Sequence, residues 1–208
     1  SGSGNGVVVK SNKAAPSLSQ LKTACSIANA LLYLHSKKIV FRDLKPANVG
    51  FNSRGVLKLF DFGFAIGLND DNNNNEQLYD MCGTPRYMAP EVRLGLGYSF
   101  PVDVHSFGIL LWEICSLKKP FGNIKSSEEF RKSVFEKGVR PKLARYWPQV
   151  LKDTMCGCWC SEPGERPTME VVTTMLGAHV KEVSSLQQQQ QNNDGSLRKS
   201  SVFRRLTG

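Results

Sequence analysis

The sequence predicts an α+β fold that is mainly helical, with a short β-hairpin region after the first helix. Three observations lead to this prediction. Apolar residues recur at helical spacing over 18–37, two strand-like runs at 39–41 and 56–60 are separated by turn residues, and residues 102–117 are apolar on almost every side. The chain has 208 residues and is 40% hydrophobic, which is sufficient to form a core.

The first helix is predicted at 18–37. Ser17 and Gln20 have the spacing of a capping box, in which each side chain bonds to the backbone of the other residue. Apolar side chains then lie on one face, including Leu21, Ala28 and Leu31. After the first strand, the turn residues Asn-Ser-Arg-Gly at 52–55 predict a reversal of the chain before the second strand.

Helical patterns follow at 102–117 and near 126–137, 147–160 and 168–183. A polar stretch at 69–77, with asparagine at 72–75, predicts a surface loop. Residues 1–17 are rich in Gly, Ser and Asn and predict a flexible linker or insertion. Glutamine fills 187–191 and the end is basic, so we expect a disordered tail over 184–208 and an ordered domain over 18–183.

Charge and composition exclude several classes of protein. The net charge is +9, but no basic stripe is interleaved with aromatic residues, so we expect no nucleic-acid partner. No run approaches the ~20 apolar residues of a membrane span, so we expect no membrane partner. The polar first residues do not resemble a signal peptide, which favours a cytoplasmic location with reduced thiols. The Cys-x-Cys-x-Cys run at 156–160 lacks a second, spaced ligand pair, so buried thiols are favoured over zinc.

Three ordered motifs carry the chemistry. Residues 41–48 read Phe-Arg-Asp-Leu-Lys-Pro-Ala-Asn, residues 61–63 read Asp-Phe-Gly, and residues 83–91 read Gly-Thr-Pro-Arg-Tyr-Met-Ala-Pro-Glu. Together they resemble the catalytic loop, the magnesium-binding triplet and the Ala-Pro-Glu segment of the protein kinase family. The resemblance covers about residues 18–183 and implies the mainly α-helical large, C-terminal lobe of a protein-kinase-like fold.

The resemblance implies a role for each polar residue of the first two motifs. Asp43 would accept the proton of the substrate hydroxyl, and Lys45 would pair with the γ-phosphate of ATP. Asn48 and Asp61 would supply oxygen ligands to Mg²⁺, a hard cation. Gly63 is expected to permit the backbone turn that aims Asp61 inward. The implied partners are therefore a nucleotide, ATP with Mg²⁺, and protein substrates.

Lysine at position 45 resembles the serine/threonine class of kinases. Thr84 matches the threonine that in this class bonds the catalytic aspartate and lysine, and it is also a plausible turn residue before Pro85. Glu91 and Arg166 resemble the buried ion pair of the family under the activation segment. Asp103 resembles the acid that anchors the backbone of the catalytic loop. We expect these last three residues to be structural.

The chain departs from the family pattern at two places within the motifs. Phe41 stands where the family usually has histidine, and we expect its ring to stack against Phe62. The activation segment contains no Ser or Thr between Gly63 and Thr84. Arg42 is typical of kinases that are switched by phosphorylation there. We hypothesise that Asp80 takes the place of the phosphate opposite Arg42; the alternatives are that Tyr79 is modified or that Asp80 is merely solvated.

A third departure concerns the small, N-terminal lobe. Its five-stranded sheet and helix need at least ~60 residues, and only 17 precede the first predicted helix. The sequence therefore predicts a chain in which this lobe is absent, and which alone binds ATP poorly and is inactive. The function implied is that of a serine/threonine protein kinase. The alternative is a non-catalytic, pseudokinase-like module that binds other proteins.

Overall fold

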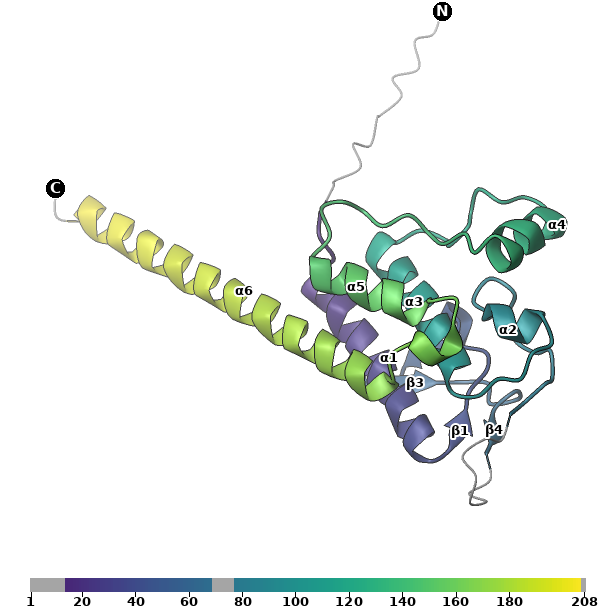
Figure 1. Ribbon diagram of the computed structural model, residues 1–208. Coiled ribbons are helices and arrows are strands. Elements are labelled where there is room, and N and C mark those ends of the chain that lie inside the picture. Colours follow the sequence, from purple (N-terminus) through teal and green to yellow (C-terminus); the bar gives the residue numbers. More distant parts are fainter. Residues whose placement is uncertain (1–13, 69–76, 207–208) are drawn as a thin grey trace, which may run out of the picture.

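Helix α3 (Pro101–Ser116) lies at the centre of the computed structural model, which describes residues 14–68 and 77–206. It packs against helix α1 (Leu18–Ser36) and helix α5 (Gln149–Cys158), and helix α6 (Met169–Leu206) packs along α1 (Figure 1). Nearly every side chain of α3 from Val102 to Trp112 is buried, which confirms the prediction of a helix enclosed on all sides. The helix ends at Leu117, whose φ of +53° is left-handed.

Helix α1 begins as the sequence predicts. Ser17 N donates to Gln20 Oε1 at 2.8 Å, and Gln20 N donates to Ser17 Oγ at 3.3 Å, so the capping box is confirmed. Its apolar face packs into the core through Leu21, Ile27 and Leu31. These contacts fix the helix against α3 and bring its C-terminal end, with His35, next to the loop that follows β1.

Two small antiparallel sheets follow α1. Strand β1 (Ile39–Val40) pairs with β4 (Ile66–Gly67), and β2 (Val49–Phe51) pairs with β3 (Leu57–Leu59). In the turn at 52–55, Asn52 Oδ1 accepts hydrogen bonds from the backbone N–H groups of Arg54 and Val56, which confirms the predicted turn. The two predicted strands do not pair with each other, because β1 pairs with β4 and β3 pairs with β2. The strands are shorter than predicted, and β2 and β4 were not anticipated because each has too few residues to show an alternating pattern.

The remaining elements surround this core. A short 3₁₀ turn η1 (Pro46–Asn48) precedes β2, and helix α2 (Pro90–Arg93) follows the Gly-Thr-Pro segment. The pattern at 126–137 forms α4 (Ser127–Phe130), capped by Ser126, and a π-helical turn η2 (Arg131–Glu136). A second 3₁₀ turn, η3 (Pro163–Glu165), leads into α6.

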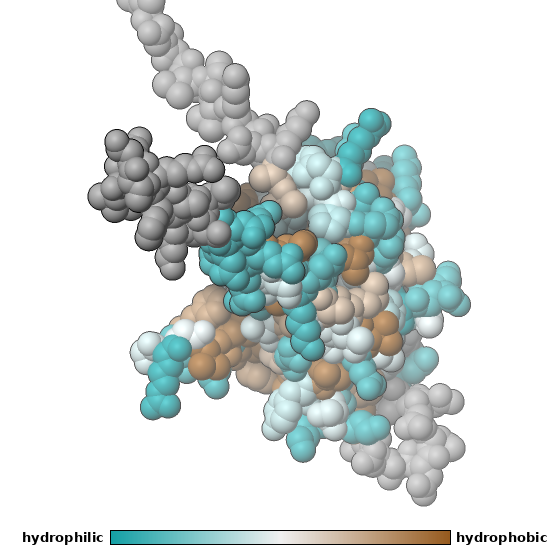
Figure 2. Space-filling view, turned by 90° about the vertical axis from the view of Figure 1, so that its left-hand side faces the viewer, coloured by the Kyte–Doolittle hydropathy of each residue, from teal (hydrophilic) through white to brown (hydrophobic). Residues whose placement is uncertain are grey.

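The C-terminal region differs from the prediction. The helix expected at 168–183 continues in the structure through 184–206, where the sequence predicted a disordered tail (Figure 1). Glutamine at 187–191 is a good helix former and no proline interrupts 184–206, which favours continuation of the helix past residue 183. The glutamine side chains of this part are exposed. On the side of the molecule from which α6 projects, hydrophilic and hydrophobic side chains are interspersed (Figure 2).

Two other predicted segments fall largely where the structure gives no description. The linker predicted at 1–17 is described only from residue 14, and the polar loop predicted at 69–77 only at Gln77. Helix lengths and the β-hairpin otherwise agree with an α+β fold dominated by helices.

Candidate active site

The loop after β1 is held by a buried carboxylate. Asp103 accepts hydrogen bonds from the backbone N–H groups of Phe41 at 2.7 Å and Arg42 at 2.8 Å. His35 Nε2 lies 3.0 Å from the same carboxylate, which is fully buried. Arg42 has a φ of +68°, an unusual conformation for a residue with a side chain. The hydrogen bonds that Asp103 accepts therefore hold a strained loop in one conformation.

The Asp43 side chain is the centre of a hydrogen-bonded group. Thr84 Oγ1 donates to Asp43 Oδ1 at 2.7 Å, and Lys45 Nζ lies 2.6 Å from Asp43 Oδ2. Lys45 Nζ also lies 3.1 Å from Thr84 Oγ1. Asn48 Nδ2 donates to the Asp43 carbonyl oxygen at 2.9 Å and to Oδ2 at 3.2 Å. Four residues singled out in the sequence are thus brought together around one carboxylate.

Asp61 is placed beside this group and does not contact it. Phe60 N donates to the Asn48 carbonyl oxygen at 2.9 Å, so the residue before Asp61 is tied to the backbone of the catalytic loop. The Asp61 side chain is exposed, and its only described hydrogen bond is from Gly63 N to Oδ1 at 3.3 Å. Among the described residues, no hydrogen bond or ion pair joins Asp61 to Asp43, Lys45 or Asn48.

The expected role of Gly63 needs correction. The left-handed conformation lies at Asp61, with φ of +57°, and not at Gly63. Aspartate tolerates this region better than most residues. A Cβ atom at Gly63 would lie 3.2 Å from Asp61 Oδ1, so a larger residue there would require the exposed Asp61 carboxylate to shift slightly.

Phe41 packs as the sequence predicts. It is fully buried, and its ring centroid lies 5.3 Å from that of Phe62 with an interplanar angle of 75°. This edge-to-face contact confirms the predicted stacking. The replacement of histidine by phenylalanine thus keeps an aromatic contact between the catalytic loop and the Asp-Phe-Gly segment.

The activation segment lies against Arg42. Arg42 Nη1 lies 3.5 Å from Asp80 Oδ2, and the same guanidinium donates to Tyr98 Oη at 3.1 Å and, through Nε, to the Phe64 carbonyl oxygen. Tyr98 Oη in turn donates to the Asp80 carbonyl oxygen at 2.7 Å. Burial raises the pKa of Tyr98 to about 12, so it stays a neutral donor. Tyr79 is exposed and does not contact Arg42.

Glu91 and Arg166 form a buried bidentate ion pair. Their two N–O distances are 2.5 and 2.9 Å, and both side chains are almost inaccessible to solvent. Arg166 also donates to the carbonyl oxygens of Cys160, Pro101 and Ser161. The pair therefore links α2, at the end of the activation segment, to the start of α3 and the segment before α6.

Comparison with known proteins gives the family. Residues 7–176 match the model of the protein kinase domain. The chain belongs to the protein kinase family. The match covers the catalytic loop, the Asp-Phe-Gly triplet and the Ala-Pro-Glu segment, and it begins within the part of the chain expected to be a linker.

Three relatives illustrate the similarity of this kinase chain to curated proteins. It is 33% identical over 172 residues to a probable serine/threonine-protein kinase of Dictyostelium discoideum, which is 83% of the chain and 10% of the relative. It is 36% identical over 153 residues to human mitogen-activated protein kinase kinase kinase 7, or 72% of the chain and 24% of the relative. It is 35% identical over 144 residues to a dual specificity protein kinase of Dictyostelium discoideum, which is 69% of the chain and 22% of the relative. The chain thus spans at most about a quarter of the length of each of these proteins.

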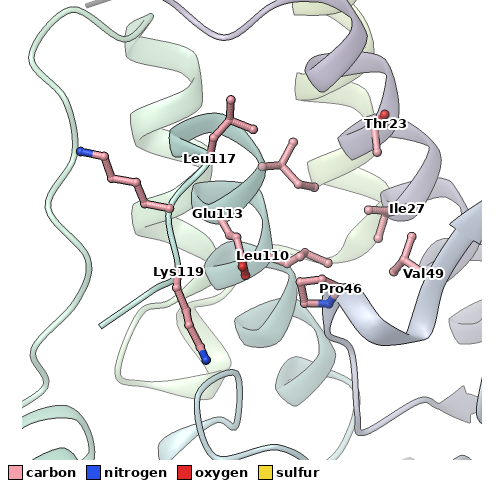
Figure 3. A pocket seen from close by; sticks show the side chains of 10 residues that line it. Thr23, Ile27, Pro46, Val49, Leu110, Glu113, Leu117 and Lys119 are labelled. Atoms are coloured by element: carbon pink, nitrogen blue, oxygen red, sulfur yellow. The ribbon is translucent and has the colours of Figure 1, made fainter. Parts of the chain in front are cut away.

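A separate apolar pocket lies behind the catalytic loop of this kinase domain. It has a volume of about 400 Å³ and opens between α1, α3 and the segment from Pro46 to Val49 (Figure 3). Glu113, in its wall, accepts a hydrogen bond from Tyr87 Oη at 2.6 Å. Neither Asp43 nor Asp61 lines it, so it is separate from the hydrogen-bonded group around Asp43.

The sequence did not reveal two residues that hold the kinase motifs. Tyr98 bonds to Arg42 from 56 positions away, and His35 bonds to Asp103 from 68 positions away. Neither residue belongs to a short motif, so no local signal could have identified it. None of the helices in the described ranges is long and apolar enough to cross a membrane.

Cys158 is buried on α5, and burial raises the pKa of its thiol to about 12, whereas Cys156 is exposed. Within 14–68 and 77–193, no three His, Cys, Asp or Glu side chains are placed to share a metal ion.

Proposed function

We propose that the protein is a serine/threonine protein kinase, which transfers the γ-phosphoryl group of ATP to hydroxyl groups of protein substrates. Membership of the protein kinase family supports the reaction class, and the name of one relative, a probable serine/threonine-protein kinase, favours the serine/threonine class. The observation that carries the proposal is the Asp43 carboxylate, which Thr84, Lys45 and Asn48 hold in one orientation.

Asp43 is the proposed base. Each carboxylate oxygen can accept more than one hydrogen bond, so a substrate hydroxyl can still bond to Asp43 beside Thr84 and Lys45. As the hydroxyl oxygen bonds to the γ-phosphorus and the bond to the leaving ADP breaks, the hydroxyl proton passes to the carboxylate. Lys45, whose side chain is 24% exposed, has a third N–H donor beside those directed to Asp43 and Thr84, and this donor can pair with the γ-phosphate. Thr84 keeps the carboxylate oriented throughout.

Asn48 and Asp61 are the proposed holders of Mg²⁺. The Asn48 amide nitrogen is committed to Asp43, which turns Oδ1 away from that residue and leaves it without a hydrogen-bond donor in the described part of the chain. Asp61 contributes two carboxylate oxygens, of which only Oδ1 accepts a described bond. Oxygen donors of this kind fit a hard divalent cation. When bound, Mg²⁺ neutralises charge that develops on the phosphates.

Asp80 is the proposed substitute for an activating phosphate. Its carboxylate is 77% exposed and 3.5 Å from Arg42, so the contact is weak, but Tyr98 binds both partners and holds the segment in place. The kinase would then keep its activation segment docked without modification. Glu91, Asp103 and Arg166 are proposed to act structurally, through the contacts described above.

The test compares full-length protein with its Asp43→Asn variant in an ATP- and Mg²⁺-dependent assay on Ser, Thr and Tyr peptides. Loss of the base should lower kcat by about 10²–10⁴-fold. Asp153→Asn, a change of an exposed carboxylate on α5, is the matched control and should keep normal activity. Equal turnover by Asp43→Asn would refute the role of Asp43, and transfer to tyrosine alone would refute the serine/threonine class.

Binding of protein partners without any phosphoryl transfer would instead favour the alternative, a non-catalytic interaction module. The expectation that residues 1–208 alone turn over slowly stays a prediction, and the same assay on that segment checks it.

A further inference from the structure

A second, larger pocket opens beside the proposed base. It has a volume of about 810 Å³ and lies between residues 81–93, which include α2, and residues 124–135, which include α4 and η2. Thr84 lines it, and the hydroxyl of Thr84 bonds to Asp43. A peptide whose hydroxyl reaches Asp43 would therefore place its neighbouring residues at this pocket.

The charged groups of the pocket are predominantly cationic. Four cations line it, against one carboxylate, so its formal charge is +3; the cations are Arg86, Arg93, Lys125 and Arg131, and the carboxylate is Glu128. We refer to it as the cationic pocket. An excess of one sign of charge in a partly enclosed site attracts ligands of the opposite sign.

The single carboxylate is already neutralised. Glu128 pairs with Arg131 at 2.7 Å and with Lys132 at 3.2 Å. The hydrogen bond from Arg131 lowers the pKa of Glu128 to about 2, so it stays ionised and paired. Glu128 therefore does not compensate the other cations of the pocket.

Three cations remain without a carboxylate partner in the described ranges. Arg93 donates to Met81 Sδ at 3.2 Å, a weak acceptor, and Arg86 donates to the Pro120 carbonyl oxygen. The Arg86 guanidinium also lies 5.9 Å from the centre of the Phe130 ring. Lys125 is exposed and makes no described ion pair. These side chains are available to an anionic ligand.

The pocket also has apolar walls. Met81, Met88, Phe130 and Phe135 line it, and the two phenylalanine rings pack edge to face with centroids 5.6 Å apart. Apolar walls exclude water and strengthen charge interactions nearby. They would accommodate the aliphatic part of a peptide whose acidic groups reach the cations.

We propose that the cationic pocket binds the part of a protein substrate that flanks the acceptor residue, and that it selects substrates with anionic side chains there. The anion is a carboxylate or the phosphate of a previously modified residue. The inference rests on the proposed function in one respect, since it assumes that the acceptor hydroxyl is presented to Asp43.

The test measures binding of fluorescent peptides to the full-length protein by anisotropy. The peptides carry alanine at the acceptor position and share their apolar residues, and their flanking positions carry Asp, phosphoserine or Lys. We expect the Asp peptide to bind at least about tenfold more tightly than the Lys peptide at low salt, since several charge pairs add. Tighter binding of phosphoserine than of Asp would identify phosphate as the preferred anion, and equal binding would identify any acidic residue.

Charge-reversal variants test whether the cations of the pocket cause the preference for acidic peptides. Arg93→Glu and Lys125→Glu should each reduce the preference several-fold. Lys22→Glu makes the same change on the exposed face of α1, outside the pocket, and should keep the preference of the wild type. Thermal melting of each variant confirms folding. Equal binding of Asp and Lys peptides, or a preference that survives both pocket variants, would overturn the inference. A single-stranded oligonucleotide that competes as well as the Asp peptide would also overturn it, by identifying an unselective anion-binding surface.

The binding assay is independent of phosphoryl transfer. If the acidic preference holds while no phosphate is transferred, the proposed function fails and the pocket assignment stands. If the protein phosphorylates acidic and basic substrates with equal kcat/KM, the kinase assignment stands and the inference about the pocket fails.

Discussion

Replacement of Arg166 by methionine should lower the free energy of unfolding by about 3–5 kcal/mol, because it leaves a buried charge without its partner. The Arg166 side chain is 0% exposed and that of Glu91 is 5% exposed. Both carboxylate oxygens of Glu91 accept from Arg166, and no other donor reaches them in the described residues. Since water cannot replace the lost hydrogen bonds, the variant must bury an unpaired carboxylate or protonate it.

Replacement of the other partner, Glu91, should lower the free energy of unfolding by less. In Glu91→Gln, Arg166 keeps its bonds to the carbonyl oxygens of Cys160 at 2.9 Å, Pro101 at 3.0 Å and Ser161 at 3.4 Å. The guanidinium thus stays partly satisfied, and we expect a loss nearer the lower end of the same range, about 3 kcal/mol. The double variant should be less unstable than the sum of the two single variants, because it removes both charges together.

Urea unfolding measures these differences, and thermal melting should show Arg166→Met about 6–20 °C below the wild type, at about 2–4 °C per kcal/mol. The control is Arg131→Ala, which breaks an exposed pair with Glu128 and should leave stability unchanged. A loss below about 1 kcal/mol for Arg166→Met, or strict additivity in the double variant, would refute the reasoning that a desolvated ion pair dominates at this site.

Three further predictions concern the loop, the activation segment and pH. Gly83 has a φ of +98°, and a Cβ atom there would lie 2.5 Å from the Arg42 carbonyl oxygen, so Gly83→Ala should cost more than about 1 kcal/mol in urea unfolding and lower kcat. Asp80→Ala should lower activity, by at most about fivefold because the contact with Arg42 is exposed, while Tyr79→Phe leaves it intact in a peptide assay. Burial, followed by the charges of nearby arginines, holds the pKa of His105 well below its usual value. Because the pKa of His105 is lower in the folded than in the unfolded state, the stability that its neutral form allows is fully present above about pH 6.5 and is lost as the pH falls, at up to about 1.4 kcal/mol per pH unit. His105→Gln should flatten this part of the pH profile of the free energy of unfolding.

Each of these predictions has a result that contradicts it. Gly164→Ala, where a Cβ atom meets nothing within 4 Å, is the control for Gly83→Ala, and equal stability of the two would rule out the predicted clash. Normal activity of Asp80→Ala with reduced activity of Tyr79→Phe would favour modification of Tyr79. An unchanged pH profile for His105→Gln would place the acid sensitivity elsewhere.

Much of the fold was predictable from local patterns. Helix α1 with its capping box, the buried helix α3 and the turn at 52–55 depend on residues that are neighbours in the sequence. The extent of α6 was not predictable in this way, because a polar glutamine-rich run is compatible with both helix and disorder. The sequence also did not predict that Asp61, and not Gly63, adopts the left-handed conformation, since both residue types tolerate such a turn.

The sequence by itself determined which residues are proposed to carry the chemistry, because the spacing of Asp43, Lys45, Asn48 and Asp61 forms motifs that short segments contain in full. Only the tertiary structure decided how Thr84 and Tyr98 reach the catalytic loop, and which cations gather beside it. Motifs are local, whereas these contacts join segments tens of residues apart, and their geometry depends on how α1, α2 and α3 pack around the loop.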